Sequence, residues 1–238
     1  MMLSFTKNLT INIFLSIFQY HVCDLLIAHW CQKERTKAIF GKYYDNFYRE
    51  VTYRFNSIIH AVFTSILSSL YLMEMIDSNI IDVIFINSMG YCLYDLYIIS
   101  STKDDPHKIQ FIIHHSMMFF ILFMNYNTEH INILLITKGL LAEWSTIFIN
   151  LSIIFYRIGL ANSKIFKLNS WISVLAFLVF RILLYPFWIY QIFQLNYFYC
   201  LLTIVFYVLN CMWFFKLIEN HLKIVIKGST KNYTIEID

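Results

Sequence analysis

Hydrophobic residues along this 238-residue chain gather in seven long runs, which short polar segments separate. A helix of about 20 predominantly apolar residues is long enough to cross the hydrocarbon core of a bilayer. The pattern therefore predicts an all-α fold with seven membrane-spanning helices. The predicted helices cover residues 9–30, 53–76, 80–100, 109–126, 131–158, 169–193 and 197–217.

Three of these runs carry local features that change the picture. The first run contains Gln19, His21 and Asp24, which we expect to form a polar face against the other helices. It is long and no small-residue cleavage site follows it, so we expect it to be retained as a helix. The fifth run is long enough to tilt or break. In the sixth, Pro186 cannot donate the hydrogen bond that the carbonyl of Ile182 would accept, so a kink or a local pocket is expected there.

The amino-acid composition is typical of an integral membrane protein. Hydrophobic residues make up 59% of the chain and charged residues only 14%, against about 25% charged in soluble domains. The length fits one helical bundle without an added soluble domain, and we expect no nucleic-acid partner. The five cysteines form no CxxC pair, which indicates small buried side chains rather than a metal or redox site.

Basic residues are concentrated in every second loop, and this bias predicts the orientation. The segments after the first, third, fifth and seventh runs are basic, whereas the other three connections hold no Lys or Arg. Because cytosolic loops carry the excess of positive charge, the N-terminus is predicted to be lumenal or extracellular and the C-terminus cytosolic. The residues that carry the bias are Lys33, Arg35, Lys37, Lys42, Arg49, Lys103, Lys108, Arg157, Lys164, Lys167, Lys223, Lys227 and Lys231.

Two adjacent histidines, His114 and His115, interrupt the fourth run near its predicted cytosolic end. Other runs contain the ionisable residues Asp95, Glu143 and Arg181. A charged side chain facing lipid costs about 2.5–3.5 kcal/mol on insertion scales, so we expect these groups to pair inside the bundle. Neighbouring residues on a helix point about 100° apart. We therefore expect one histidine to act on a substrate as a general base while Asp95 or Glu143 holds the other.

Most other polar residues in the runs are expected to make hydrogen bonds between helices. Arg54 lies at the membrane edge, where its side chain is expected to extend toward lipid headgroups. We expect no metal site, because adjacent histidines chelate poorly from a helix and the chain has no HExxH motif. The residues expected to join helices are Asn56, Asn87, Asn150 and Asn210.

Six motifs in a fixed order resemble those of the TLC domain, which translocon-associated, longevity-assurance (ceramide synthase) and ceroid-lipofuscinosis membrane proteins share. The resemblance covers roughly residues 40–227 and is greatest to the TLC-domain-containing proteins similar to transmembrane protein 56. The motifs are Arg54-Phe-Asn-Ser-Ile-Ile-His60-Ala, Gly90-Tyr-Cys-Leu-Tyr-Asp95-Leu, His114-His115, Glu143-Trp-Ser145-Thr146-Ile-Phe-Ile-Asn150, Phe177-Leu-Val-Phe180-Arg181 and Leu209-Asn210-Cys-Met-Trp213-Phe.

The resemblance implies a bundle of six transmembrane helices around a central cavity, preceded by one extra helix. The expected organisation is an N-terminal helix with the start of the first cytosolic loop at residues 1–39, the TLC domain at 40–227 and a short cytosolic tail at 228–238. His114 and His115 would be the catalytic candidates within the cavity. The expected supporting residues are His60, Asp95, Glu143, Asn150, Arg181 and Asn210.

Two functions remain open at this point. In ceramide synthases the paired histidines serve acyl transfer from acyl-CoA to a sphingoid amine, and further aspartates follow the pair. Here Glu143 and Asn150 stand downstream instead. The resemblance therefore favours membrane lipid homeostasis, with a lipid or acyl chain bound in the bundle, no cofactor, and the endoplasmic reticulum as the expected location. The alternative is an acyl-CoA-dependent N-acyltransferase, with acyl-CoA as co-substrate and Lys103, His107 and Lys108 near its phosphates.

Overall fold

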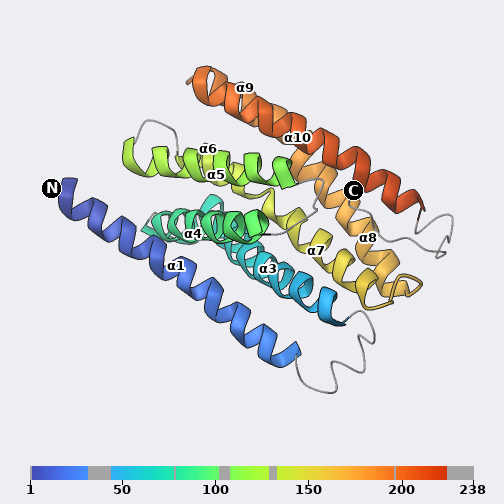
Figure 1. Ribbon diagram of the computed structural model, residues 1–238. Helices are drawn as coiled ribbons and strands as arrows, with labels where there is room; N and C mark the ends of the chain where they lie inside the picture. The colour runs from blue at the N-terminus through green and yellow to red at the C-terminus, as the bar shows by residue number, and fades with distance from the viewer. Residues whose placement is uncertain are drawn as a thin grey trace.

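The computed structural model describes residues 2–31, 44–77, 79–101, 108–128, 133–195 and 197–223, and all regular secondary structure in these ranges is helical (Figure 1). This confirms the predicted all-α fold. The helices are α1 (Met2–Cys31), α3 (Tyr44–Leu72), α4 (Asn79–Ser101), α5 (Lys108–Thr128), α6 (Ile133–Leu140), α7 (Glu143–Arg157), α8 (Lys164–Phe177), the π-helix η2 (Leu178–Leu183), α9 (Tyr185–Phe193) and α10 (Tyr197–His221).

Within the described residues, six helical stretches are long and apolar enough to cross a membrane, and α1 adds a shorter apolar stretch at Ile13–Leu26. They correspond one to one with the seven predicted runs. The predicted fifth helix is formed by α6 and α7, and the sixth by α8, η2 and α9. Seven of the thirteen basic residues that predict the orientation lie outside the described residues: Lys33, Arg35, Lys37, Lys42, Lys103, Lys227 and Lys231. His107, proposed to lie near the acyl-CoA phosphates, also lies outside them, as does the tail from residue 224.

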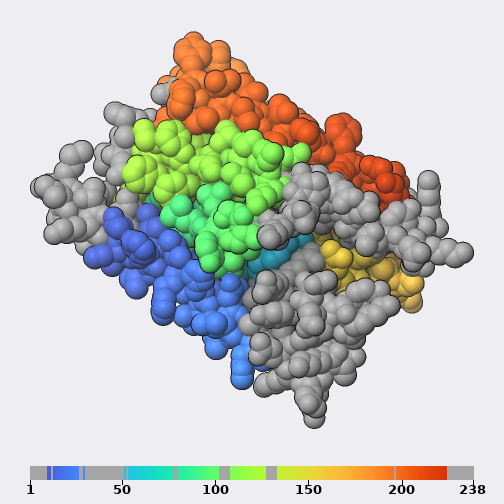
Figure 2. Space-filling view, viewed as in Figure 1, coloured from blue at the N-terminus to red at the C-terminus, as the bar shows by residue number. Residues whose placement is uncertain are grey.

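The helices form a bundle with α4 near its middle (Figure 1). α4 packs against α1, α3 and α5, while α7 packs against α3 and α8. α10 covers α8, η2 and α9. Figure 2 shows α1 in blue along one edge of the molecule and α10 in red along the opposite edge, with α5 between them on this face. The cavity described below lies in the half of the bundle that α5, α6, α9 and α10 enclose.

The fifth and sixth predicted helices are both interrupted, and both interruptions position polar groups. The fifth breaks between Leu140 and Glu143, so that Glu143 begins a new helix. A carboxylate is favoured there because the helix dipole is positive at its N-terminus. In the sixth, a π-helical turn precedes Pro186, and the amide of Leu184 bonds to the carbonyl of Val179 at 3.1 Å. The kink expected at the proline is confirmed, and the wide turn buries Arg181.

A tight connection between α7 and α8 brings these two interruptions together. Gly159 has a φ of 79°, which a residue without Cβ adopts at little cost. Ser163 then caps α8, its hydroxyl accepting a hydrogen bond from the amide of Phe166 at 3.1 Å. Asn169 on α8 donates to Ser152 on α7 at 2.7 Å. The two stretches therefore run side by side, and Arg181 faces the first turn of α7.

The first helix is joined to the bundle through polar contacts. Asp24 accepts a hydrogen bond from Asn56 Nδ2 at 2.7 Å and another from the Tyr94 hydroxyl at 2.5 Å. The Tyr20 hydroxyl donates to Asn87 Oδ1 at 2.8 Å. The expected polar face on this helix is thus confirmed for Asp24, which joins α3 and α4 to α1. We call Tyr20, Asp24, Asn56, Asn87 and Tyr94 the α1 cluster.

Arg54 makes contacts within the bundle. Its Nη1 donates to Asn150 Oδ1 at 3.1 Å, and the guanidinium lies 5.1 Å from the ring centroid of Tyr53. Asn150 in turn donates to Ser57 at 3.0 Å. The contact satisfies the amide oxygen of a buried Asn, which would otherwise cost free energy, whereas the contact of Arg54 with headgroups stays a prediction.

Candidate functional site

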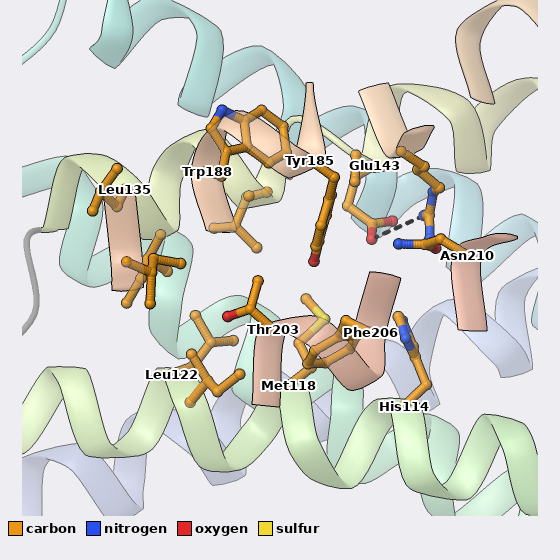
Figure 3. Close-up of a pocket in the computed structure, with 17 residues that line it drawn as sticks. His114, Met118, Leu122, Leu135, Glu143, Tyr185, Trp188, Thr203, Phe206 and Asn210 are labelled. Carbon is orange, nitrogen blue, oxygen red and sulfur yellow. Dashed lines mark hydrogen bonds and ion pairs between the residues drawn. The ribbon is translucent and has the colours of Figure 1, made fainter. Parts of the chain in front are cut away.

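A cavity of about 100 Å³ lies between α5, α6, α9 and α10. Figure 3 shows that its two ends differ in chemistry. Leu122 and Leu135 lie at one end, whereas His114, Glu143 and Asn210 lie at the other. We call these the apolar end and the polar end. Aromatic and apolar side chains line the stretch between them, which suits a flexible hydrocarbon chain with a polar group at one terminus.

Arg181 organises the polar end. Its Nε donates to Ser145 Oγ at 2.7 Å, Nη1 donates to Asn210 Oδ1 at 3.2 Å and Nη2 donates to Thr146 Oγ1 at 2.8 Å. The residue is 5% exposed. Because every nitrogen of the guanidinium has an acceptor, the charge is held in one position rather than left mobile.

Glu143 supplies the opposite charge. Its Oε1 lies 3.7 Å from Arg181 Nη2, and both side chains are buried (Figure 3). The distance is long for a direct hydrogen bond, so the pairing is mainly electrostatic. A buried cation needs such a partner, since an unpaired charge in a low-dielectric interior is very costly. The fixed charges of the polar end therefore sum to zero.

His115 and Asp95 form a second buried pair, of a basic and an acidic side chain. His115 Nε2 lies 3.1 Å from Asp95 Oδ2, and Nδ1 lies 3.0 Å from the carbonyl oxygen of Phe111. A carbonyl oxygen only accepts, so Nδ1 carries a proton. The other nitrogen faces a carboxyl oxygen, so the imidazole is held between Asp95 and the backbone. This pair lies behind the cavity wall and does not line it.

His114 faces the cavity that His115 does not reach. It lines the polar end, and its ring stands edge-to-face against Phe206 and Trp213, with ring centroids 5.0 and 5.2 Å away. Its ring centroid is 5.1 Å from that of His115, with the planes at 89°. Among the described residues, His114 Nδ1 is buried without a hydrogen-bond partner. The helical spacing thus divides the adjacent histidines between Asp95 and the cavity.

The predicted site residues separate into four places. His114, Glu143, Arg181 and Asn210 line the cavity, and His115 with Asp95 stands beside it. His60 does not line it. The His60 ring stacks on Tyr91 with centroids 4.0 Å apart. Asn150 also lies elsewhere, between Arg54 and Ser57.

Sequence reasoning did not select Tyr185, Trp188 and Gly139, which also line the cavity. Figure 3 shows the Tyr185 hydroxyl pointing into the space between the two ends. Tyr185, Trp188 and Ile192 have the i, i+3, i+7 spacing of one helical face, which was a usable signal. The sequence holds no such signal for Gly139, because a glycine has no side chain to contribute to a pattern of apolar positions. No group of three or more potential metal ligands occurs within the described ranges.

Comparison with models of protein families matches residues 2–219 to the TLC domain. The match covers most of the chain, so the protein belongs to the TLC-domain family, and its apolar helices make it a multi-pass integral membrane protein. The matched range includes α1, which the sequence assigns to a separate segment at residues 1–39; the domain boundaries and the subgroup stay predictions. Searches of curated proteins and of solved structures returned no match.

Proposed function

We propose that this protein binds a membrane lipid through one acyl chain in the cavity and thereby acts in membrane lipid homeostasis. The observation that carries the proposal is the cavity's division into an apolar end and a polar end (Figure 3). An acyl chain in the cavity would make van der Waals contacts with the apolar walls. The polar group of the lipid would then lie beside His114 and Asn210.

The charge balance of the polar end favours an uncharged headgroup. Arg181 already has Glu143 as its counter-charge, and its nitrogens have acceptors in Ser145, Asn210 and Thr146. A free carboxylate or phosphate would add an uncompensated charge to a water-poor site. A hydroxyl, ester or amide adds none, and the Tyr185 hydroxyl, which points into the cavity, offers it a hydrogen bond.

The proposal includes an orientation and a location. The bias of Lys and Arg along the sequence supports a lumenal or extracellular N-terminus and a cytosolic C-terminus. The polar end of the cavity would then lie toward the cytosol, because His114 follows Lys108 by less than two helical turns. Membership of the TLC-domain family supports the endoplasmic reticulum.

Photolabelling with an uncharged lipid tests the binding. A long-chain fatty alcohol that carries a diazirine is added to vesicles holding the purified protein, and labelled residues are identified by mass spectrometry. We expect labelling at Tyr185, which lines the cavity, and at Phe187, which is 68% exposed on the same helix. Excess unlabelled alcohol should remove the label from Tyr185, because the cavity holds one chain. Phe187 should stay labelled, because it contacts bulk lipid.

The two positions serve as each other's control. Label on Phe187 alone, or label on Tyr185 that no excess of competitor reduces, would show that the cavity holds no lipid. A diazirine fatty acid provides the charged comparison. It should label Tyr185 more weakly than the alcohol does if the balanced Arg181–Glu143 pair excludes an added anion.

The second candidate is an acyl-CoA-dependent N-acyltransferase, and the division of the histidines favours it. His114 lines the cavity, and Asp95 holds His115. The ring centroids of the two histidines are only 5.1 Å apart. An amine would attack the thioester carbonyl, and the C–S bond would break as the amide forms. His114 would take the proton of the amine and give it to the departing coenzyme A sulfur, which leaves as the thiol. His115 would be a positioning residue in this reaction.

If the protein is an acyltransferase, His114→Ala lowers acyl transfer from acyl-CoA to a long-chain base by about 10²–10⁴-fold, the usual contribution of a general base. The matched control is Ser116→Ala on the exposed side of α5, which should keep wild-type turnover. The assay follows coenzyme A release from the purified protein. Wild-type protein that releases none with any amine offered leaves lipid binding as the function.

A further inference from the structure

Gly139 occupies a distinctive place in the cavity wall. It lies in the last turn of α6 and lines the cavity between the ends that Leu135 and Glu143 mark. A Cβ added at Gly139 would meet no neighbouring heavy atom within 4 Å. By contrast, a Cβ at Gly90 would overlap the Ser16 side chain. Gly139 is therefore not required by close packing, and the absence of its side chain leaves space in the cavity.

We propose that Gly139 determines the length of the acyl chain that the cavity accepts. The proposal rests on the proposed function, since it assigns a specificity-determining residue to the same site. With no side chain at Gly139, the polar and apolar ends remain continuous. A large apolar side chain at this position would close the passage and leave only the part beside the polar end. Gly139 therefore determines the chain length of the lipid that binds, and it does not contact the polar group of that lipid.

The helix gives the size of the effect. Gly139 follows Leu135 by four residues within α6. Each four-residue step advances about 6 Å along a helix. An extended chain advances roughly 1.2 Å for each bond, judging from the span of an extended peptide. Closure at Gly139 should therefore shorten the accepted chain by about five carbon atoms.

Side chains larger than hydrogen are compatible with the backbone at this position. Gly139 lies within α6 and does not have a positive φ, so L-residues fit its conformation. Replacing a helical glycine also raises helix propensity, by up to about 1 kcal/mol. A graded series of Gly139→Ala, Gly139→Leu and Gly139→Phe therefore changes mainly the space in the cavity. The matched control is Leu134→Phe, which adds bulk to the exposed side of the same helix.

The experiment measures competition between the diazirine fatty alcohol and unlabelled saturated alcohols of increasing chain length. In the wild type, competition should strengthen with each added methylene until the cavity is filled, because each one adds van der Waals contacts with the wall. In the Leu and Phe variants this increase should stop about five carbons earlier. Gly139→Ala and Leu134→Phe should follow the wild type. Thermal unfolding of each variant in detergent shows which ones are folded, and the folded members of the series decide the result.

The outcomes separate the two proposals. Wild-type protein without saturable labelling at Tyr185 contradicts the proposed function and this inference with it. Saturable wild-type binding with an unchanged length dependence in folded Gly139→Leu contradicts the role of Gly139 alone. A folded Gly139→Leu variant that binds no alcohol of any length also contradicts it, since Gly139 would then act at the polar end.

Discussion

Replacing Arg181 with Met should lower the free energy of unfolding by about 3–5 kcal/mol, the usual cost of breaking a buried ion pair. The substitution removes three hydrogen bonds, those to Ser145, Thr146 and Asn210. It also leaves Glu143 buried without its counter-charge. Met has similar length and flexibility, so the loss of packing is small. Unfolding of the purified protein in detergent, followed by circular dichroism, measures the change.

The double variant Arg181→Met with Glu143→Leu provides the control. Removing both charges eliminates the uncompensated carboxylate, so this protein should regain a large part of the lost stability. The free energy of unfolding that the double variant still lacks measures the cost of leaving polar groups of Ser145, Thr146 and Asn210 unpaired. An Arg181→Met protein within about 1 kcal/mol of the wild type would mean that water or lipid already solvates this end of the cavity.

Arg181 and Glu143 also lie where the two helices that form this end of the cavity are interrupted. The break before Glu143 and the π-turn at Arg181 both interrupt helices that otherwise span without interruption. Interruptions in membrane helices are tolerated where the backbone lines a cavity or is buried in protein. The ion pair lies between these two irregular segments. The polar end of the cavity therefore contributes both to stability and to the proposed lipid binding, so substitutions there affect both.

Hydrophobic runs predicted the fold well because the bilayer forces backbone hydrogen bonds to be satisfied within each span. The kink at Pro186 was also predictable, since proline acts locally. The division of His114 and His115 between two partners followed from helical geometry. In each case the cause lies within one helix and is visible in the residues themselves.

Contacts between distant helices were not predictable in the same way. The sequence offered both Asp95 and Glu143 as partners for a histidine, and only packing decided that Asp95 holds His115. The contact of Arg54 with Asn150, 96 residues away, was not anticipated either. Gly139 gave no signal because its contribution is unfilled space. These features depend on tertiary arrangement, which a pattern along one chain does not encode.

Replacing Gly90 with Leu should separate α1 from α4 and lower the free energy of unfolding by about 3 kcal/mol, the upper end of the range for overpacking. Even a single added Cβ at Gly90 would overlap the Cβ and Oγ of Ser16. That close approach lets Ser16 donate to the carbonyl of Asn87 at 3.3 Å. Displacing α1 also strains the α1 cluster, in which Asp24 accepts from Asn56 and Tyr94.

A paired substitution identifies the cause. Gly90→Ala alone should destabilise less than Leu does, because its overlap is smaller and helix propensity returns up to about 1 kcal/mol. Adding Ser16→Gly removes both atoms that the new methyl group meets, so the double variant should recover most of the loss. Hydrogen exchange supplies the local readout: amides of α1 should exchange faster in Gly90→Leu and return toward wild-type rates in the Ala–Gly pair. Failure of Ser16→Gly to improve Gly90→Ala would place the strain elsewhere on α4. Rescue would show that α1 belongs to the packed bundle, because a helix held only by lipid would not respond to a methyl group on α4.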